Sequence, residues 1–447
     1  MGWLDKLFGK KEQNPTNIPG SASLRFGRYS DNNKPLAKTH KWYEAEDFFK
    51  AKNYPGAIAA FFDYLRDDKE DNVIFRPQGE QFSFELYQGS KHIYGSCDGS
   101  HITAEVPVVK MNSPSAAVMR RMLELNFGLY YTRTALRDDN VLSMIFETPL
   151  EAANPNKLYY GLKELATKAD RQDDTLIADF KMLEAVDTGH IQSLPDAELD
   201  VKYTYFRKWI EEALQRISTL NQDSFSGSIA YLLLNTLYRI DYLIAPEAKL
   251  LADLEKINGI YWTKKDEVPI IERNQMMQDE LRKLLQLSRE DFALNLYRAK
   301  ATFAITNPPK MDKTKETIEN SNRDSYWYIE NKHPDLALIL NEYGLSYNQY
   351  TFSMPDVLAE LYHLYMTVMH ADYFEAVGAQ KKIYQAAANQ FNKSWIQQRV
   401  LQIVGKHREK FPYLVFDPAQ LRFDSLYNFG ISFSEQLANA NLDPRKN

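Results

Sequence analysis

The chain has 447 residues, of which 44% are hydrophobic and 13% aromatic, so it can build sizeable cores and does not belong to the disordered class. Its formal net charge is −6 and neither of its long blocks is basic, which excludes a surface that follows nucleic-acid phosphates. The single cysteine, Cys97, excludes an intrachain disulfide. No apolar run reaches the roughly 18 residues of a membrane span, so we expect a cytoplasmic protein.

Residues 1–40 are predicted to be an N-terminal amphipathic segment followed by a flexible linker. Four apolar residues recur at helical spacing near the start, namely Trp3, Leu4, Leu7 and Phe8. Two interpretations remain open: a frayed first helix, or a docking segment for a membrane surface or a partner's groove. Residues 12–40 contain several Asn, Pro and Ser residues and little periodic apolar content, which is typical of a linker.

Residues 41–110 are predicted to form two short helices and a three-stranded meander. The helices occupy 41–66 and are separated by a break at residues 53–56. Apolar and polar residues then alternate with the period of a strand, and Gln88-Gly89 and Asp98-Gly99 mark two hairpin turns. The third strand covers His101–Val109.

Residues 114–186 are predicted to contain a helix, two strands and a long final helix. Pro114 opens a helix over 114–127, and short strands follow at 128–131 and 141–146. Asn154-Pro155 then starts a helix that runs from 156 to about 186. Because helices and strands do not alternate one for one, we predict an α+β domain with an antiparallel sheet over residues 41–190.

The segment from Met119 to Asp179 resembles the YbjN-like proteins, which are described as bacterial sensory-transduction regulators. The residues that carry the resemblance are Asp138-Asp139-Asn140-Val141, Thr148-Pro149-Leu150 and the run from Asn154 to Asp170. The resemblance extends over about 44–190 and implies a fold similar to that of type III secretion chaperones. It also implies binding of a client or regulator protein, and pairing of two copies through the helix between the third and fourth strands.

Residues 191–447 are predicted to be all helical. Long segments with a period of 3.6 residues are separated by Pro-containing breaks, which indicates some ten helices packed as one or two bundles. A division of this region is expected near residues 307–314, at Asn307-Pro308-Pro309. Tyrosines cluster in the last third, either as a ligand groove or, preferably, as bulky filler between helices.

The sequence contains few residues in patterns typical of catalysis, cofactor binding or metal binding. The sequence has no phosphate-binding loop, dinucleotide fingerprint or nucleophile elbow, so we expect no cofactor and no enzymatic activity. Cys97 and His101 flank a hairpin turn, but no third group to orient the histidine is evident. Glu360, His363 and His370 lie on one helical face and are the best candidate for a metal or catalytic site, although a packed helix is the preferred interpretation.

The sequence therefore predicts a non-enzymatic, chaperone-like or regulatory protein that binds another protein. The predicted partner or dimer surface is the apolar face of the helix over 114–127, formed by Val118, Met119, Met122 and Leu123. A homodimer is favoured because two-fold dimers are the commonest oligomers. Membrane contact, if present, is peripheral and uses the N-terminal segment. The alternative is an enzyme of unknown class with a site in the helical half.

Overall fold

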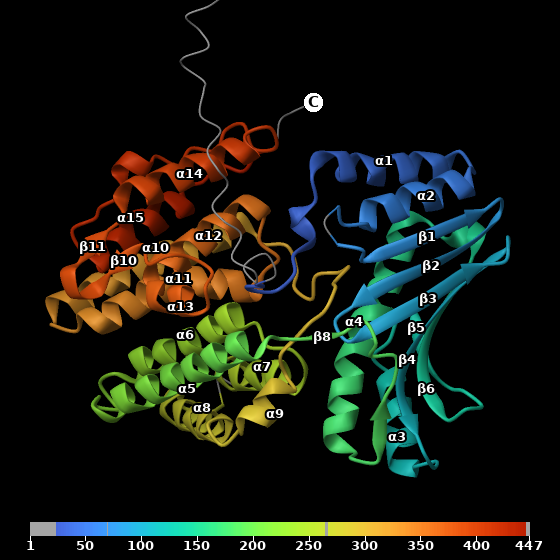
Figure 1. Cartoon of the computed structure of the whole chain (residues 1–447), viewed down its shortest axis with the longest axis horizontal. Coiled ribbons are helices and arrows are strands. Elements are labelled where there is room, and N and C mark those ends of the chain that lie inside the picture. The colour runs from blue at the N-terminus through green and yellow to red at the C-terminus, as the bar shows by residue number, and fades with distance from the viewer. Residues whose placement is uncertain (1–23, 69, 264–266, 444–447) are drawn as a thin grey trace, which may run out of the picture.

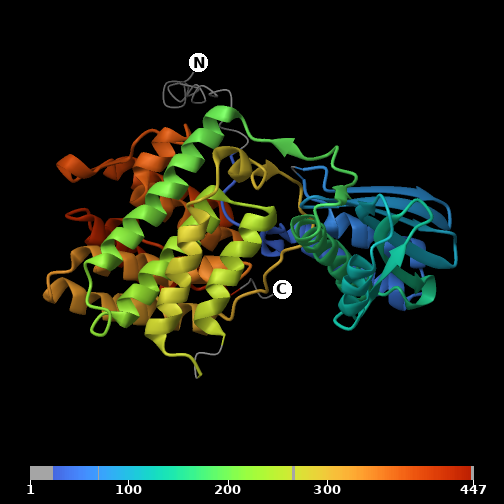
Figure 2. The same ribbon diagram turned by 90° about the horizontal axis from the view of Figure 1, so that it is seen from below.

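The structure, a computed structural model, describes residues 24–68, 70–263 and 267–443. Two halves lie side by side: one contains a sheet with helices around it, and the other is helical (Figure 1). Figure 2 shows from below that segments of chain cross from one half to the other. The predicted fold class, an α+β domain followed by an all-α half, is confirmed.

The α+β half is built around one antiparallel sheet. The strand order is β1-β2-β3-β4-β6-β5, and β7 pairs with the end of β4. The elements are α1 (Leu36–Lys50), α2 (Tyr54–Leu65), β1 (Val73–Gln78), β2 (Gln81–Gln88), β3 (Lys91–Cys97), β4 (His101–Met111), α3 (Ala116–Asn126), β5 (Thr132–Leu136), β6 (Val141–Pro149), α4 (Pro155–Asp179) and β7 (Leu183–Ala185).

The meander has four strands, and the prediction of three was wrong by one. The additional strand, β1, pairs with β2 through a turn at Gly79, whose φ of +69° suits glycine. Its alternation is hard to see in the sequence because Pro77 interrupts it. Proline is tolerated here because β1 is an edge strand, where one side of the backbone needs no partner.

Helix α4 packs its apolar side against the sheet and carries the core of this half. The side chain of Asn154 accepts the N–H of Lys157 at 2.9 Å, and Pro155 occupies the first turn, as the sequence predicts. Leu158, Leu162 and Leu165 are fully buried against the strands. The helix ends at Asp179, earlier than predicted, because the chain leaves it to pair β7 with β4.

The helical half is organised around α6, a helix that is buried on nearly every side, as expected for a core helix. Its helices are α5 (Asp196–Ser218), α6 (Ser226–Ile244), α7 (Ala248–Trp262), α8 (Ile270–Leu284), α9 (Arg289–Ala293), α10 (Met311–Glu330), α11 (Pro334–Thr351), α12 (Asp356–Met369), α13 (Ala371–Ala376), α14 (Lys393–His407) and α15 (Leu426–Ala438). Two small ladders join β8 (Gln192–Ser193) to β9 (Tyr297–Arg298) and β10 (Tyr384–Gln385) to β11 (Gln390–Phe391).

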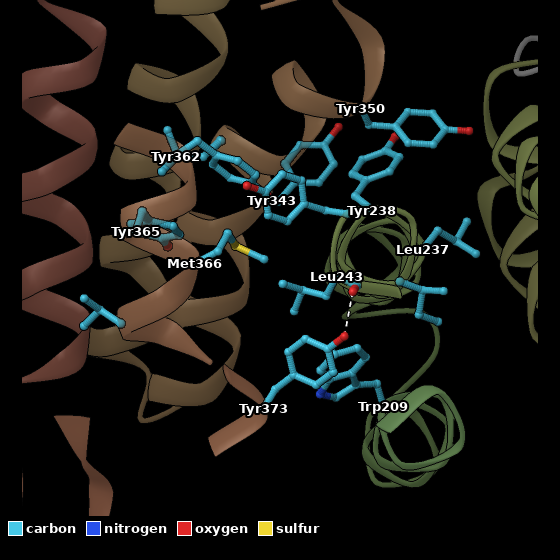
Figure 3. Close-up of a cluster of buried hydrophobic side chains, with 14 of the residues drawn as sticks. Trp209, Leu237, Tyr238, Leu243, Tyr343, Tyr350, Tyr362, Tyr365, Met366 and Tyr373 are labelled. Atoms are coloured by element: carbon cyan, nitrogen blue, oxygen red, sulfur yellow. Dashed lines mark hydrogen bonds between the residues drawn. The ribbon is translucent and has the colours of Figure 1, made fainter. Parts of the chain in front are cut away.

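The clustered tyrosines of this half fill its core. Figure 3 shows Tyr238 beside Tyr343 and Tyr350 of α11. It also shows Tyr373 beside Trp209, and the Tyr373 hydroxyl donates to the carbonyl of Leu243 at 2.7 Å. Tyr365 is fully buried. Side chains from both sides of residues 307–314 share this core, so the expected division there is wrong.

The end of the predicted linker is packed between the halves. Residues 24–35, which we call the N-terminal strap, include a half-buried arginine, Arg28, that binds Asp241 at 2.8 Å and Glu255 at 3.2 Å. At the other end of the strap, Asp31 accepts the N–H of Ala304 at 2.9 Å. The prediction of a flexible linker to residue 40 is therefore wrong for this stretch, because polar strap residues find partners in both halves.

A second segment crosses back from the helical half into the α+β half. In residues 299–304, which we call the return segment, the carbonyl of Lys300 accepts the N–H of Gly89 at 3.0 Å. Phe303 is fully buried in the core of the α+β half, with its ring 5.4 Å from that of Tyr159. Each half thus takes part of its packing from a segment that lies outside it in the sequence.

Candidate functional site

The helix predicted to bind a partner, α3, presents only two of its four predicted residues to the outside. Val118 and Met122 are buried in the core of the α+β half, so they do not contribute to an exposed surface. Met119 and Leu123 are exposed, to 37% and 64%. The apolar face is therefore divided: Val118 and Met122 hold the helix on the sheet, and Met119 and Leu123 remain at the surface.

The loop that follows α3 continues the exposed apolar surface. Phe127 is 98% exposed and Tyr130 92% exposed. Together with Met119, Leu123 and Tyr131 they form what we call the α3–β5 surface. Exposed single apolar residues are ordinary, so the feature of interest is that several large ones follow one another along this helix and loop.

This loop is held in place by one carboxylate from α4. Glu164 accepts the N–H groups of Tyr130, Tyr131 and Thr132 at 2.8–2.9 Å, and also the Thr132 hydroxyl at 3.0 Å. The strand predicted at 128–131 is therefore wrong, since β5 begins at Thr132. The aromatic residues that look like a strand in the sequence are displayed on a fixed loop.

Two backbone amides at the edge of the sheet beside this surface are already bound by side chains. The N–H of Thr132 is bound by Glu164, and that of Thr134 donates to the side chain of Asn126 at 3.0 Å. Unpaired amides on an edge strand are what an incoming strand uses. A partner at the α3–β5 surface would therefore contact side chains.

No model of a known protein family matches the chain, and no curated protein matches it. The assignment of a function accordingly depends on the geometry of the chain itself.

A cavity of about 760 Å³ lies between the two halves. It is lined by α4 on one side and by α7, the N-terminal strap and the return segment on the other. The volume is within the range of small-molecule sites, but its walls carry many charges of both signs. The carboxylates of α4 are the most unusual of these.

Two of the α4 carboxylates are fully engaged in holding the β2–β3 turn. Asp170 accepts the backbone N–H of Ser90 at 2.7 Å, and Asp173 binds Lys91 at 2.6 Å in a buried ion pair. Gly89 lies so close to Asp170 that a Cβ at this position would be 2.1 Å from its Oδ1. Carboxylate oxygens of Asp170, Asp173 and Asp174 lie within 4.8 Å of one another. The contacts just described give Asp170 and Asp173 a structural role.

The remaining carboxylates, Asp174 of α4 and Glu247 at the start of α7, differ from these. In the part of the chain that the structure describes, neither side chain has a hydrogen-bond or ion-pair partner. Burial, reinforced by the charges of Asp173 and Asp170, raises the pKa of Asp174 to about 9. Burial and the charge of Asp170 raise the pKa of Glu247 to about 8.

The three residues considered for a metal or catalytic site in the helical half are not brought together. His363 is half-buried between the rings of Phe26 and Phe374, and desolvation there lowers its pKa to about 4. His370 binds Glu342 at 3.1 Å. Glu360 is engaged elsewhere, with Lys406 and His407 of α14.

Cys97 and His101 are not a catalytic pair. Cys97 is buried and faces Ile102 across the β3–β4 turn. His101 is exposed and pairs with Pro149 on the next strand. Successive residues of a strand point to opposite faces, so the thiol and the imidazole are separated by the sheet.

The predicted docking segment, Trp3, Leu4, Leu7 and Phe8, lies outside the described residues. Within the described residues, no helix has the length and apolar character needed to cross a bilayer. Phe127 and Tyr130 are the site residues that sequence reasoning missed. Their signal was the presence of aromatic residues on both sides of Gly128, but the sequence analysis places Phe127 at the end of a helix and Tyr130 in a strand.

Proposed function

We propose that the chain is a non-enzymatic, protein-binding protein of the chaperone-like or regulatory kind that the YbjN-like resemblance implies. The observation that carries the proposal is the exposure of Phe127, at the end of α3, and of Tyr130, whose backbone N–H is bound by Glu164. Aromatic side chains dominate the centres of protein interfaces because they bury a large area with few rotatable bonds. A loop that is already ordered loses little entropy on binding.

The first partner that we propose is a second copy of the chain. Arg120 and Glu124 flank Leu123 on the exposed side of α3 and lie 2.9 Å apart in an exposed ion pair. When two copies of α3 cross antiparallel on a two-fold axis near Leu123, each Arg120 approaches the Glu124 of the other copy. The surface is thus complementary to itself in charge, as a two-fold interface requires.

The test of this partner is the oligomeric state. We expect the wild type to sediment as a dimer at micromolar concentration, and Leu123→Glu to sediment as a monomer because it buries a charge in the seam. The matched control is Leu294→Glu, at a leucine that is 75% exposed on the helical half and should leave the dimer intact. A monomeric wild type contradicts the second copy as the partner.

Binding of a protein partner at the α3–β5 surface can be tested separately from dimer formation. A photo-reactive phenylalanine in place of Phe127 should form a covalent adduct in cells, while the same group in place of Leu294 should not. An adduct with a second copy supports the dimer, and an adduct with one other protein supports a client or regulator. The absence of any adduct at Phe127 contradicts protein binding at this surface.

A further inference from the structure

A second hollow, which we call the aromatic groove, lies where α1 and the start of α4 meet the helical half. It has a volume of about 580 Å³ and is more open to solvent than the cavity beside α7. Aromatic side chains from α1, α2 and α4 form one part of its lining, namely Trp42, Tyr43, Tyr64, Tyr159 and Tyr160. The helical half adds apolar side chains, which are those of Pro308, Pro309, Met311, Pro355, Phe411 and Leu442.

The aromatic rings of the groove form a continuous row. The ring centroid of Trp42 lies 5.0 Å from that of Tyr64 and 6.0 Å from that of Tyr159. The row continues from Tyr159 to Tyr160, whose ring centroids are 5.4 Å apart, and each of these three pairs meets edge to face. Trp42 is half-buried and Tyr160 is 54% exposed. The row is therefore held at its centre and accessible at its end.

The charged residues that line the groove, among the described residues, are already engaged. The Nζ of Lys34 donates to a backbone carbonyl at 3.1 Å, and that of Lys410 donates to two, at 3.0 and 3.2 Å. Asp31 accepts the hydroxyl of Tyr159, and it also accepts the N–H of Ala304 at 2.9 Å. A ligand that is recognised mainly by its charge therefore does not suit this groove.

The polar atoms that remain free in the groove are neutral hydrogen-bond donors. Within the part of the chain that the structure describes, the indole N–H of Trp42 and the hydroxyls of Tyr64 and Tyr160 have no hydrogen-bond partner. None of these atoms is sealed from solvent, so water can bind them in the free protein. Covering them without a new partner costs free energy. A ligand that fills the groove must therefore be largely apolar and must offer uncharged acceptors.

We propose that the aromatic groove binds a proline-rich segment of a partner protein in the polyproline II conformation. In that conformation the backbone has no internal hydrogen bonds, so its carbonyl groups are free to accept from the neutral donors of the groove. Proline has no N–H, so the segment needs no acceptor in return. Such segments dock in grooves lined by aromatic rings, because they are already extended and lose little entropy on binding. The site is separate from the α3–β5 surface and does not rest on the proposed function.

The experiment titrates the full chain into a fluorescently labelled decaproline peptide and measures the fluorescence anisotropy. We expect a saturable rise, and no rise with a glycine-serine peptide of the same length, which is a flexible coil without rings. The absence of a rise with decaproline overturns the proposal, and so does equal binding of the two peptides. Indole is titrated in parallel by calorimetry. Binding of indole without binding of decaproline would assign the groove to a small aromatic ligand and would also overturn the proposal.

Two variants and a control assign the binding to this groove. Trp42→Phe removes the indole N–H but keeps a ring, and it should weaken decaproline binding about two- to tenfold, as expected for one lost hydrogen bond. Tyr160→Ala should weaken it about fivefold or more, and this exposed position keeps the test decisive if Trp42→Phe does not fold. The matched control, Trp327→Phe, changes a tryptophan of α10 that is 51% exposed and should bind as the wild type does. Unchanged binding by both groove variants overturns the proposal.

Discussion

The carboxylate of Glu164 accepts hydrogen bonds from three consecutive amides, those of Tyr130, Tyr131 and Thr132. Two oxygen atoms thereby set the position of the backbone that carries Tyr130, whose side chain is 92% exposed. Hydrogen bonds to a charged group contribute about 1.5–3 kcal/mol each when sheltered, and less where water competes. The α3–β5 surface consequently depends on a residue that is distant from it in the sequence and is not apolar.

Removing this carboxylate should loosen the loop without unfolding the domain. In Glu164→Ala we expect the amides of residues 130–132 to exchange with deuterium faster than in the wild type, because they lose their acceptor. The dimer proposed above should also weaken, since its aromatic residues are no longer held in place. The control is Glu151→Ala, at an exposed glutamate beyond β6. Unchanged exchange at residues 130–132 would show that Glu164 does not hold the loop.

At the scale of elements, a histidine links α12 to α14. His407 lies between Asp356 at 3.2 Å and Glu360 at 3.0 Å. Burial by itself lowers the pKa of His407, but the hydrogen bonds and charges of these carboxylates outweigh it and raise the pKa to about 9. The two helices are thus held together by a positive imidazolium between two negative groups.

The stability that His407 contributes should decrease as the pH rises. Because its pKa is higher in the folded state, the contribution is complete below about pH 6.5 and is lost as the pH rises through about 9. We expect the difference in unfolding free energy between the wild type and His407→Gln to shrink over that window in denaturant titrations. His40→Gln, at an exposed histidine of α1, should show no such convergence. If the difference in unfolding free energy between the wild type and His407→Gln does not change with pH, a charged His407 does not link α12 to α14.

The elements with clear periodicity were predictable, and those defined by distant partners were not. The hairpin turns, the Asn154 cap and the apolar side of α4 follow from local sequence, and each is found as predicted. Strand β1 was missed because Pro77 is acceptable only at an edge, and the sequence does not say which strand is at the edge. Residues 128–131 have the composition of a strand, but Glu164, more than thirty residues later, fixes them as a loop.

The candidate site was only partly predictable for the same reason. Helical spacing correctly gave α3 an apolar face, but it does not show which of those residues the sheet covers. Met119 and Leu123 were identified, Val118 and Met122 were placed on the wrong side, and Phe127 and Tyr130 were missed. The cavity between the halves could not be predicted at all, because it needs the relative position of α4 and α7.

At the scale of the whole molecule, the two halves share their cores. Phe303 lies beyond the fifth helix of the helical half, yet its ring is buried in the α+β half. The predicted boundary at residue 190 therefore separates the sheet from a side chain that completes it. A fragment that ends there would leave an apolar opening beside Tyr159.

For this reason, truncating the side chain of Phe303 should substantially lower the stability of the protein. We expect Phe303→Ala to lower the unfolding free energy by about 3–5 kcal/mol, the usual range for a buried phenylalanine, in chemical denaturation. Ile305→Ala, two residues away at a side chain that is 43% exposed, should cost far less. If both variants lowered the unfolding free energy equally, the result would contradict the conclusion that Phe303 completes the core of the α+β half.

The return segment has a consequence for how the chain is made. A ribosome that has finished the sheet and α4 must add about a hundred more residues before Phe303 emerges, which takes about 5 to 20 s at typical rates of synthesis. During that interval the nascent α+β half has an open core beside Tyr159 and no strand or helix of its own to close it. Translation speed over residues 190–303 therefore sets how long an unfinished sheet is exposed to chaperones and to neighbouring nascent chains.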